Sequence, residues 1–345
     1  MALKGNKYGI HRVIEPQGVL TQAAKKIDND MTKLYSNEII CDVSALNVDS
    51  ASFHQISEAC GGDEEKIGRM IMDIVDERGK MQNPVTNSGG MFIGTVAYIG
   101  EDLDIDLKVG DKIASLVSLS MTPLKIDEIK AVHKDIDRVD ITGKAVLFET
   151  ALYAKLPEDM SEALALAALD VAGAPAQTAK LVKPGQSVLV LGGAGKSGTL
   201  VCYEAMKRVG PTGRVVAMDY SEAGLEELRK LGVCHETFQA SAAMPVDVLE
   251  KALAANNGKE YDLSICCVNV QNCEMSAILP VKDEGTVYFF SMATDFAKAA
   301  LGAEGVGKDI TMIIGNGYTK GHAQITLAQL RENAAIRNLF DQKYV

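Results

Sequence analysis

The second half of the chain alternates short apolar runs with amphipathic stretches, a pattern that predicts strands and helices in turn. Ser187–Leu191 predicts a buried strand, Lys196–Val209 a helix, and Arg214–Asp219 a second buried strand. The alternation continues through the helical stretch "EAGLEELRKLG", a strand ending at Cys267 or Val268, a helix near Glu274, the strands "GTVYFFSM" and "DITMIIGNG", and a closing helix, "LAQLRENAAIRNLF". Such alternation predicts an α/β fold with a doubly wound parallel sheet.

The first part of the chain has a different pattern, in which short β-like runs are separated by turn residues. These runs are "NEIICDVSALNV", "GMFIGTVAYIG", "LKVGDKIASLVSL" and "KAVLFETALYAKLP", and a helical stretch lies between Ser52 and Asp76. The sequence therefore predicts a β-rich domain over residues 1–157 and an α/β domain over residues 158–345. We expect the closing helix to pack back on the first domain.

The turn after the strand Ser187–Leu191 carries glycines at the spacing of a dinucleotide-binding turn, G-x-G-x-x-G. Gly193 permits the tight turn, Gly195 lets the backbone approach a pyrophosphate, and Gly198 lets the helix pack closely on the strand. Asp219 follows about 20 residues later, as the fingerprint of a Rossmann unit requires, and would bind the adenosine ribose hydroxyls. A carboxylate there favours NAD over NADP, although Lys196 leaves room for NADP. The alternative is an ordinary glycine turn in an α/β protein.

The rest of the cofactor site is expected at the carboxyl ends of the later strands, where open parallel sheets bind ligands. The predicted cofactor-binding residues are Gly193, Ala194, Gly195, Lys196, Ser197, Gly198, Asp219, Tyr220, Val268, Asn269, Ser291, Met292 and Ala293.

Composition narrows the class of protein. The 345 residues carry a net charge of −11, which argues against nucleic acid or an anionic membrane as a partner. No run approaches the roughly 20 apolar residues that span a bilayer, and the first residues lack the apolar core of a signal peptide, so a cytoplasmic location is expected. The seven cysteines show no metal-ligand spacing and are expected to be free buried thiols.

Two longer segments resemble the medium-chain dehydrogenase/reductase family. The segment "GMFIGTVAYIGEDLDIDLKVGDKI" is similar to part of that family's GroES-like domain, and "LPEDMSEALALAALDVAGAPAQTAKLVKPGQSVLVLGGAGKSG" is similar to the run into its nucleotide fold. The resemblance covers about residues 39–317. It implies a GroES-like first domain followed by a Rossmann domain.

Three further segments resemble the L-erythro-3,5-diaminohexanoate dehydrogenase family within that larger group: "HRVIEPQGVL", "AAKKIDND" and "MQNPVTNSGGMFIGTV". This resemblance implies NAD-dependent oxidative deamination of a small diamino acid at C3, in the fermentation of lysine.

The chain departs from the zinc-binding members of the larger family. Gly89, Gly90 and Met91 stand where those members have Gly-His-Glu, and Asp49 aligns with their first zinc cysteine. Since catalytic zinc needs three protein ligands and an open position, we predict no catalytic metal. A carboxylate would instead favour the iminium that hydride loss from an amine leaves. Asp49 is therefore the first catalytic candidate; the alternative is a turn carboxylate bonded to backbone amides.

Other candidates for the active site are weaker. Ser88 and Asn87 align with the family's active-site wall and would bind substrate or water, although a simple turn is an equal alternative. Asp170, which follows the helical run "EALALAAL", is a third catalytic candidate or a helix-end residue. Arg12 would pair with the substrate carboxylate and Glu15 with its distal ammonium; the alternative is a surface salt bridge.

Two other functions stay open at this point. One is a zinc-free quinone or enoyl reductase of the same fold, which would commonly use NADPH. The other is a dinucleotide-binding sensor without catalysis, because a fold alone does not define a function. The strand "DITMIIG" is predicted at a sheet edge, and an exposed edge needs cover, so a homodimer is expected.

Overall fold

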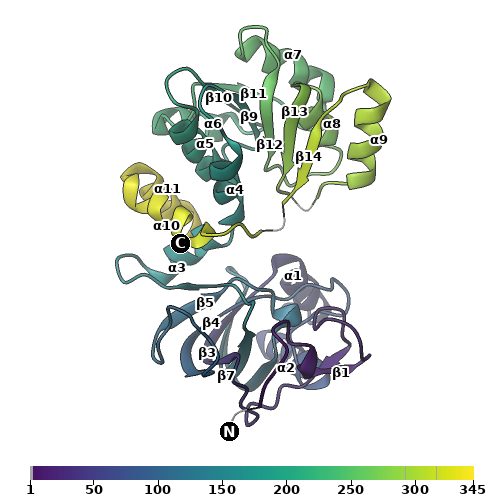
Figure 1. Cartoon of the computed structure of the whole chain (residues 1–345), viewed down its shortest axis with the longest axis vertical. Coiled ribbons are helices and arrows are strands. Elements are labelled where there is room, and N and C mark those ends of the chain that lie inside the picture. Colours follow the sequence, from purple (N-terminus) through teal and green to yellow (C-terminus); the bar gives the residue numbers. More distant parts are fainter. Residues whose placement is uncertain (1–2, 292, 316) are drawn as a thin grey trace. The chain divides into compact units, whose positions relative to one another are not determined.

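The computed structural model describes residues 3–291, 293–315 and 317–345. The chain forms two compact units, Met1–Glu158 and Asp159–Val345 (Figure 1). Each unit has its own sheet, antiparallel in the first and parallel in the second. The predicted α/β class, with a β-rich domain before a Rossmann domain, is confirmed.

The first unit is built around a six-stranded antiparallel sheet. The order of its strands is β6 (Leu124–His133), β7 (Arg138–Phe148), β3 (Glu38–Val48), β4 (Gly90–Ile99), β5 (Lys112–Ser115) and β8 (Tyr153–Lys155). The long strand β3 lies at the centre, where Ile40 is aligned with Tyr98 of β4 and Val146 of β7. A two-stranded sheet of β1 (Val13–Glu15) and β2 (Lys26–Ile27) stands apart from it.

Two helices accompany this sheet, α1 (Ser50–Ala59) and α2 (Glu64–Arg78). Helix α2 buries Ile67, Ile71 and Val75, spaced four residues apart, because this spacing places them on one face of a helix. That face belongs to the same apolar core as residues of β3, β4 and β7. Two short 3₁₀ turns, η1 (Ile10–Arg12) and η2 (Leu119–Met121), complete the unit.

Strand β6 was not predicted from the sequence. Its pairing with β7 slips between Ile126 and Glu128 and again between Ile129 and Ala131. Each slip breaks the alternation of inward and outward residues, which is the signal by which a strand is recognised in a sequence.

The second unit contains a parallel sheet in the order β11 (Glu236–Gln239), β10 (Arg214–Asp219), β9 (Ser187–Leu191), β12 (Tyr261–Cys266), β13 (Val281–Phe289) and β14 (Thr311–Ile314). This is the order 3-2-1-4-5-6 of the doubly wound nucleotide-binding fold. The order reverses between β9 and β12, so a ligand is expected at the carboxyl ends of these two strands.

Helices lie on both faces of the parallel sheet (Figure 1). The helices of this unit are α3 (Glu162–Leu169), α4 (Gly173–Leu181), α5 (Lys196–Val209), α6 (Glu222–Leu231), α7 (Pro245–Ala255), α8 (Glu274–Ile278), α9 (Phe296–Val306), α10 (His322–Glu332) and α11 (Ala334–Tyr344). Leu189 and Leu191 of β9 join the core formed with α7, α8 and α9, while Val188 and Val190 point to the other face. All four side chains are fully buried, as expected for a parallel strand covered on both faces.

The predicted limits of β9, α5 and β10 are confirmed to the residue. The predicted closing helix is two helices, because Asn333 ends α10 and its side chain accepts hydrogen bonds from the amides of Ala335 and Ile336 to begin α11. Helix α11 contacts α3 and α10 within the second unit. Strand β11 and the helices α7 and α9 had no counterpart among the predicted elements.

All seven cysteines are free thiols, five of them buried, with Cys234 and Cys267 half-buried. Burial raises the pKa of Cys41 to about 12, that of Cys234 to about 11 and that of Cys267 to about 12. Because the thiolate is the reactive form of cysteine, these side chains are poor nucleophiles at neutral pH.

Candidate active site

The glycine turn of the second unit joins β9 to α5. Gly192 adopts a left-handed backbone with φ of 76°, so the tight turn falls one residue before Gly193, where the sequence predicted it. A side chain at Gly198 would begin 1.9 Å from the carbonyl oxygen of Gly192, which explains the close packing of helix on strand. Gly195 caps α5 without a side-chain hydrogen bond. The amides of the first turn of α5 are thus available to an anion.

Asp219 lies beside this turn, at the carboxyl end of β10. Its Oδ2 accepts a hydrogen bond from the amide of Ala194 at 3.1 Å, and its Oδ1 accepts one from the amide of Ser221 at 3.0 Å. A carboxylate oxygen has more than one lone pair, so both oxygens keep capacity for ribose hydroxyls. Tyr220 follows and is 76% exposed, so its ring is available to cover a ligand.

The other predicted cofactor residues gather at the ends of β12 and β13. The amide nitrogen and side chain of Val268 lie against Gly192. Ser291 donates a hydrogen bond to the side-chain oxygen of Asn269 at 3.4 Å and accepts one from the amide of Ala293 at 3.2 Å. Met292 lies outside the described residues. The fold thus brings the glycine turn together with the Val268–Asn269 segment, as a dinucleotide site requires.

Asp170 forms an ion pair with Lys196. Its Oδ2 lies 2.6 Å from Nζ of Lys196, the first residue of α5, and both side chains are partly exposed. Ser197, the next residue of the helix, lies in the open first turn. The structure therefore links the catalytic candidate Asp170 to the glycine turn through Lys196.

In the first unit, Asp49 caps helix α1. Its Oδ1 accepts a hydrogen bond from the amide of Ala51 at 3.2 Å, as the turn alternative predicted, and its side chain is exposed. The amide of Asp49 donates to the carbonyl of Gly89 at 3.3 Å. Gly90 has φ of +108°, and a side chain there would begin 2.0 Å from the carbonyl of Asn47. This close approach holds the segment before β4 against the end of β3.

Ser88 belongs to a cluster of three hydroxyl groups. Its Oγ lies 2.6 Å from Oγ of Ser52 and 3.1 Å from Oγ1 of Thr86. Ser52 and Thr86 were not predicted as site residues. A sequence does not show that Ser52 contacts Thr86 and Ser88, which lie 34 and 36 residues further along the chain. The only sequence signal was the presence of both in the segments flanking Asp49 and Ser88.

Asn87 adopts a left-handed backbone with φ of 59°, a conformation that asparagine tolerates better than most residues. It shares a surface cavity of about 510 Å³ with Glu15 of β1. The same cavity is lined by the basic residues Lys25, Lys26 and Arg78. The structure thus brings together two of the three predicted substrate-binding residues, in a cavity with charges of both signs.

The prediction that Arg12 binds substrate is wrong. Arg12 is fully buried, with Nε and Nη2 donating to Glu38 at 3.0 and 2.6 Å. Its Nη1 and Nη2 also donate to the carbonyls of Asp30 and Lys33. Each guanidinium nitrogen already donates within the fold, and the buried side chain is not accessible to a substrate.

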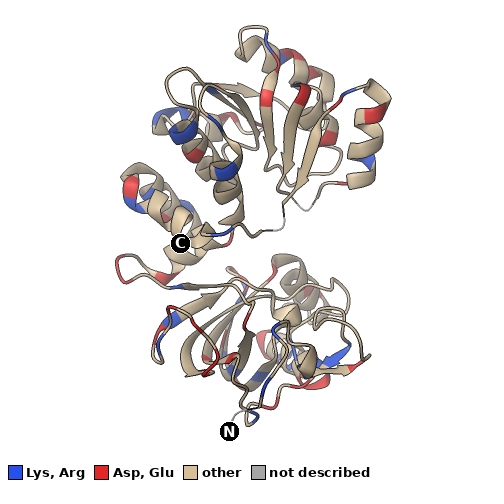
Figure 2. Ribbon diagram, viewed as in Figure 1, with Lys and Arg blue, Asp and Glu red and all other residues tan. Residues whose placement is uncertain are grey.

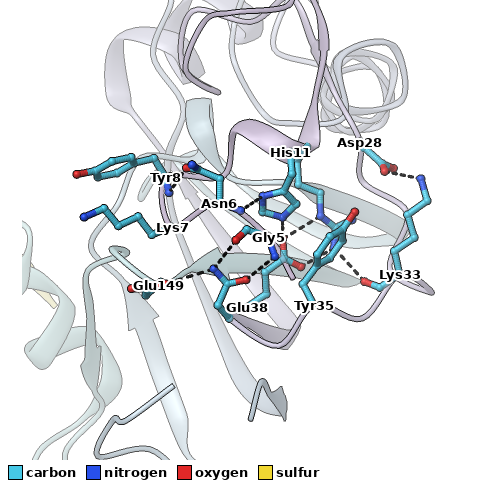
Figure 3. A network of polar contacts seen from close by, with 12 residues as sticks. Gly5, Asn6, Lys7, Tyr8, His11, Asp28, Lys33, Tyr35, Glu38 and Glu149 are labelled. Atoms are coloured by element: carbon cyan, nitrogen blue, oxygen red, sulfur yellow. Dashed lines mark hydrogen bonds and ion pairs between the residues drawn. The ribbon is translucent and has the colours of Figure 1, made fainter. Parts of the chain in front are cut away.

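Glu38 is the centre of a network that fastens the first residues of the chain to β3 (Figure 3). His11 lies 2.8 Å from Glu38 through Nε2, and its Nδ1 accepts from the amide of Asn6. Gly5 exchanges hydrogen bonds with the side chain of Asn37, beside Glu38. The network stabilises the fold, because it surrounds the buried carboxylate of Glu38 with hydrogen-bond donors.

Charges of both signs are interspersed over the ribbons of each unit (Figure 2). In the described part of the chain, no three His, Cys, Asp or Glu side chains are grouped so as to hold a metal ion. None of the helices among these residues is long and apolar enough to cross a membrane.

The glycine-turn Rossmann unit and the antiparallel unit before it define the architecture of the medium-chain dehydrogenases/reductases. The CurK enoyl reductase structure matches 90% of this chain and 81% of its own, with a TM-score of 0.54 and 17% identity. The mycobacterial protein Rv1454c, solved with NADPH, matches 90% of this chain and 82% of its own, with a TM-score of 0.52 and 15% identity. Both likenesses concern the fold.

Sequence comparison defines the family within this class. The L-erythro-3,5-diaminohexanoate dehydrogenase N-terminal domain family matches residues 11–157. L-erythro-3,5-diaminohexanoate dehydrogenase of Acetoanaerobium sticklandii is 68% identical over 345 residues, which cover 99% of this chain and 100% of the relative. The enzyme of the same name from Fusobacterium nucleatum is 63% identical over 344 residues, 99% of both chains. This chain belongs to the L-erythro-3,5-diaminohexanoate dehydrogenase family, and it is an oxidoreductase.

Proposed function

We propose that this protein catalyses the NAD-dependent oxidative deamination of L-erythro-3,5-diaminohexanoate to 5-amino-3-oxohexanoate and ammonia, a step of lysine fermentation. The observation that carries the proposal is the identity of 68%, over the whole chain, with an enzyme named for that substrate. The geometry of the glycine turn and of the Asp49 region supports it.

The reaction balances with the diamino acid, NAD⁺ and water as its only reactants. The C3 ammonium first loses a proton, because a protonated amine has no lone pair. A neutral amine has one, which stabilises the positive charge left on C3 when the hydride departs. The hydride then leaves C3, for which bound NAD supplies the acceptor. Water adds to the resulting iminium and ammonia leaves, so that one diamino acid, one NAD⁺ and one water give the oxo acid, ammonium, NADH and one proton.

The residues of the second unit fit the dinucleotide. The amides at the start of α5 have no side-chain cap and would bind the pyrophosphate, and the absence of a side chain at Gly195 would let the backbone approach it. Asp219 would bind the ribose hydroxyls, and its charge would repel the 2′-phosphate of NADP. We therefore propose NAD as the cofactor, with NADP as the weaker alternative.

Asp49 and Ser88 are the proposed catalytic residues of the first unit. The cap of α1 uses Oδ1 of Asp49, and its exposed carboxylate would stabilise a cationic amine or iminium. Because a zinc ion would oppose the same positive charge, we propose that the reaction needs no metal. Ser88 would accept a hydrogen bond from the amine.

The cavity shared by Glu15 and Asn87 is the proposed place for the charged ends of the substrate. Glu15 would pair with the distal ammonium, as expected from the sequence. The substrate carboxylate, which the buried Arg12 is not accessible to bind, would pair with Arg78 or a neighbouring lysine of the cavity.

We also propose a cytoplasmic homodimer. Strand β14 ends the parallel sheet and pairs only with β13 among the described strands. Its last residue, Ile314, is 55% exposed, so pairing of two β14 edges would cover an otherwise open strand. Light scattering coupled to gel filtration would give twice the chain mass.

The assay that tests the proposed function follows NADH absorbance with purified protein, NAD and L-erythro-3,5-diaminohexanoate. Parallel reactions replace NAD by NADP, or add a metal chelator. We expect turnover with NAD, slower turnover with NADP and no effect of the chelator.

Two other results would contradict the proposal. Reduction of a quinone or an enoyl thioester by NADPH, without amine oxidation, would assign a reductase of the same fold. NAD binding by fluorescence without turnover of any of these substrates would assign a sensor.

A further inference from the structure

Ser52, Thr86 and Ser88 form a closed triangle of hydroxyl groups. The oxygen–oxygen distances are 2.5 Å from Ser52 to Thr86, 2.6 Å from Ser52 to Ser88 and 3.1 Å from Thr86 to Ser88. Ser52, in the first turn of α1, is fully buried, whereas Thr86 and Ser88 are half-buried. The triangle therefore has a buried base and an accessible edge.

The segment that carries Thr86 and Ser88 is firmly held. Asn83, fully buried, donates from its side-chain amide to the carbonyl of Ser52 at 3.3 Å and to Oε1 of Gln55 at 2.8 Å. Its backbone amide donates to the carbonyl of Ser88, and its carbonyl accepts from the amide of Asn87. The positions of both hydroxyls relative to α1 are thus fixed by hydrogen bonds to that helix.

Counting hydrogens shows what the triangle offers a ligand. Three hydroxyls have three hydrogens, and a ring in which each hydroxyl donates to the next uses all three. The carbonyl of Ser88, 3.4 Å from Oγ of Ser52, is a further acceptor for the Ser52 hydrogen. Some oxygen lone pairs of the triangle remain free. Besides the three contacts within the triangle, only one lone pair is occupied by the described residues, that of Thr86 Oγ1, which accepts from the amide of Ser88. The accessible edge therefore accepts hydrogen bonds and does not donate them.

We propose that Ser52 and Thr86 are positioning residues that commit the Ser88 hydroxyl to accept a hydrogen bond from the reacting amine. This inference rests on the proposed function. An amine at C3 has N–H donors for Ser88, whereas a 3-oxo group has only acceptors and would face lone pairs. The triangle thus selects the amine over the oxo acid and favours release of the product.

The test compares the KM of L-erythro-3,5-diaminohexanoate with the inhibition constant of acetoacetate, an acceptor-only 3-oxo acid. Thr86→Val keeps the shape of the side chain but removes one of the two hydroxyls that Ser88 can donate to, and Ser52→Ala removes the other. Since Ser88 has one hydrogen, only the variant that removes the acceptor of that hydrogen frees it to donate. In that variant the KM for the amine rises while the inhibition constant of acetoacetate falls, and the ratio of the two changes about tenfold, the size expected for one hydrogen bond.

Two controls accompany these variants. Thr86→Ser restores a hydroxyl at position 86 and should restore both constants. Ser57→Ala removes a half-buried hydroxyl further along α1, away from the triangle, and should change neither.

A merely structural defect would not move the two constants in opposite directions. If neither Thr86→Val nor Ser52→Ala moves the two constants in opposite directions, the inference is overturned while the proposed function stands. If the unaltered protein does not oxidise the amine at all, the proposed function itself fails, and this inference with it.

Discussion

The carboxylate of Asp219 is hydrogen-bonded to the glycine turn itself, through the amide of Ala194 at 3.1 Å. The group expected to recognise the ribose is therefore held in place by the loop expected to receive the pyrophosphate. Any change at Asp219 that keeps this bond but removes the charge should act on cofactor choice without loosening the turn.

Asp219→Asn is such a change, because its side-chain oxygen can still accept from the amide of Ala194, and only the bond from the amide of Ser221 is lost. We expect kcat/KM for NADP to rise relative to that for NAD by about tenfold, since the repulsion of the 2′-phosphate is lost. Steady-state kinetics with both cofactors measure the ratio. Asp247→Asn, which removes an exposed charge on α7, is the matched control. An unchanged ratio in Asp219→Asn would show that the carboxylate does not discriminate.

The pair of Asp170 and Lys196 gives a second prediction. Asp170→Asn should change the free energy of unfolding by less than about 1 kcal/mol, because the pair is exposed. It should also tighten dinucleotide binding by roughly threefold, because the charge of Lys196 is then uncompensated at the start of α5.

Fluorescence titration of NAD and NADP measures this effect, and the double variant with Lys196→Met should abolish it. If Asp170→Asn instead loses turnover with unchanged cofactor affinity, Asp170 acts in catalysis, as first expected from the sequence.

Burial of the pair Arg12–Glu38 predicts a large effect on stability. Arg12→Met leaves the Glu38 carboxylate buried without its main partner, and should lower the free energy of unfolding by about 3–5 kcal/mol. Denaturant unfolding measures the loss. Arg331→Met, which breaks an exposed pair with Asp159, should cost less than about 1 kcal/mol. Where Arg12→Met is still folded, its KM should equal that of the unaltered protein; a raised KM would restore a role in substrate binding.

Lys80 predicts a pH dependence of stability. Its side chain is fully buried and donates to the carbonyls of Thr21 and Gln22. Burial lowers its pKa from the ordinary 10.5 to about 8. Between these values the unfolded chain binds more protons than the folded one, so raising the pH through this window stabilises the fold.

The measurement is the free energy of unfolding at pH 7.5 and 9.5 for the unaltered protein and for Lys80→Met. The unaltered protein should gain about 2 kcal/mol relative to the variant over this interval. Groups that titrate in both proteins cancel in the comparison. Equal pH dependence of the two would mean that Lys80 keeps an ordinary pKa.

The sequence predicted the parts of the fold that depend on local patterns. The unbroken apolar run of β9 and the glycine spacing after it define the turn, and Asp219 follows at the expected distance. The left-handed residue fell at Gly192 instead of Gly193, because two adjacent glycines are equally able to adopt that backbone.

The rest depends on contacts between distant residues. Arg12 looks like a surface cation in the sequence, and only the position of Glu38 on β3 explains its burial. The same is true of Ser52 and Ser88, which lie 36 residues apart in the chain and 2.6 Å apart in the fold. Polar residues that pair across a fold leave no periodic signal.

The burial of the thiols has a practical use. With no fully exposed cysteine among the seven, and with raised pKa values at Cys41, Cys234 and Cys267, maleimide dyes should react slowly with the native protein at neutral pH. One surface cysteine introduced into each unit would then be labelled selectively without first removing the native ones. A donor and an acceptor fluorophore attached in this way would report the distance between the two units with and without cofactor and substrate.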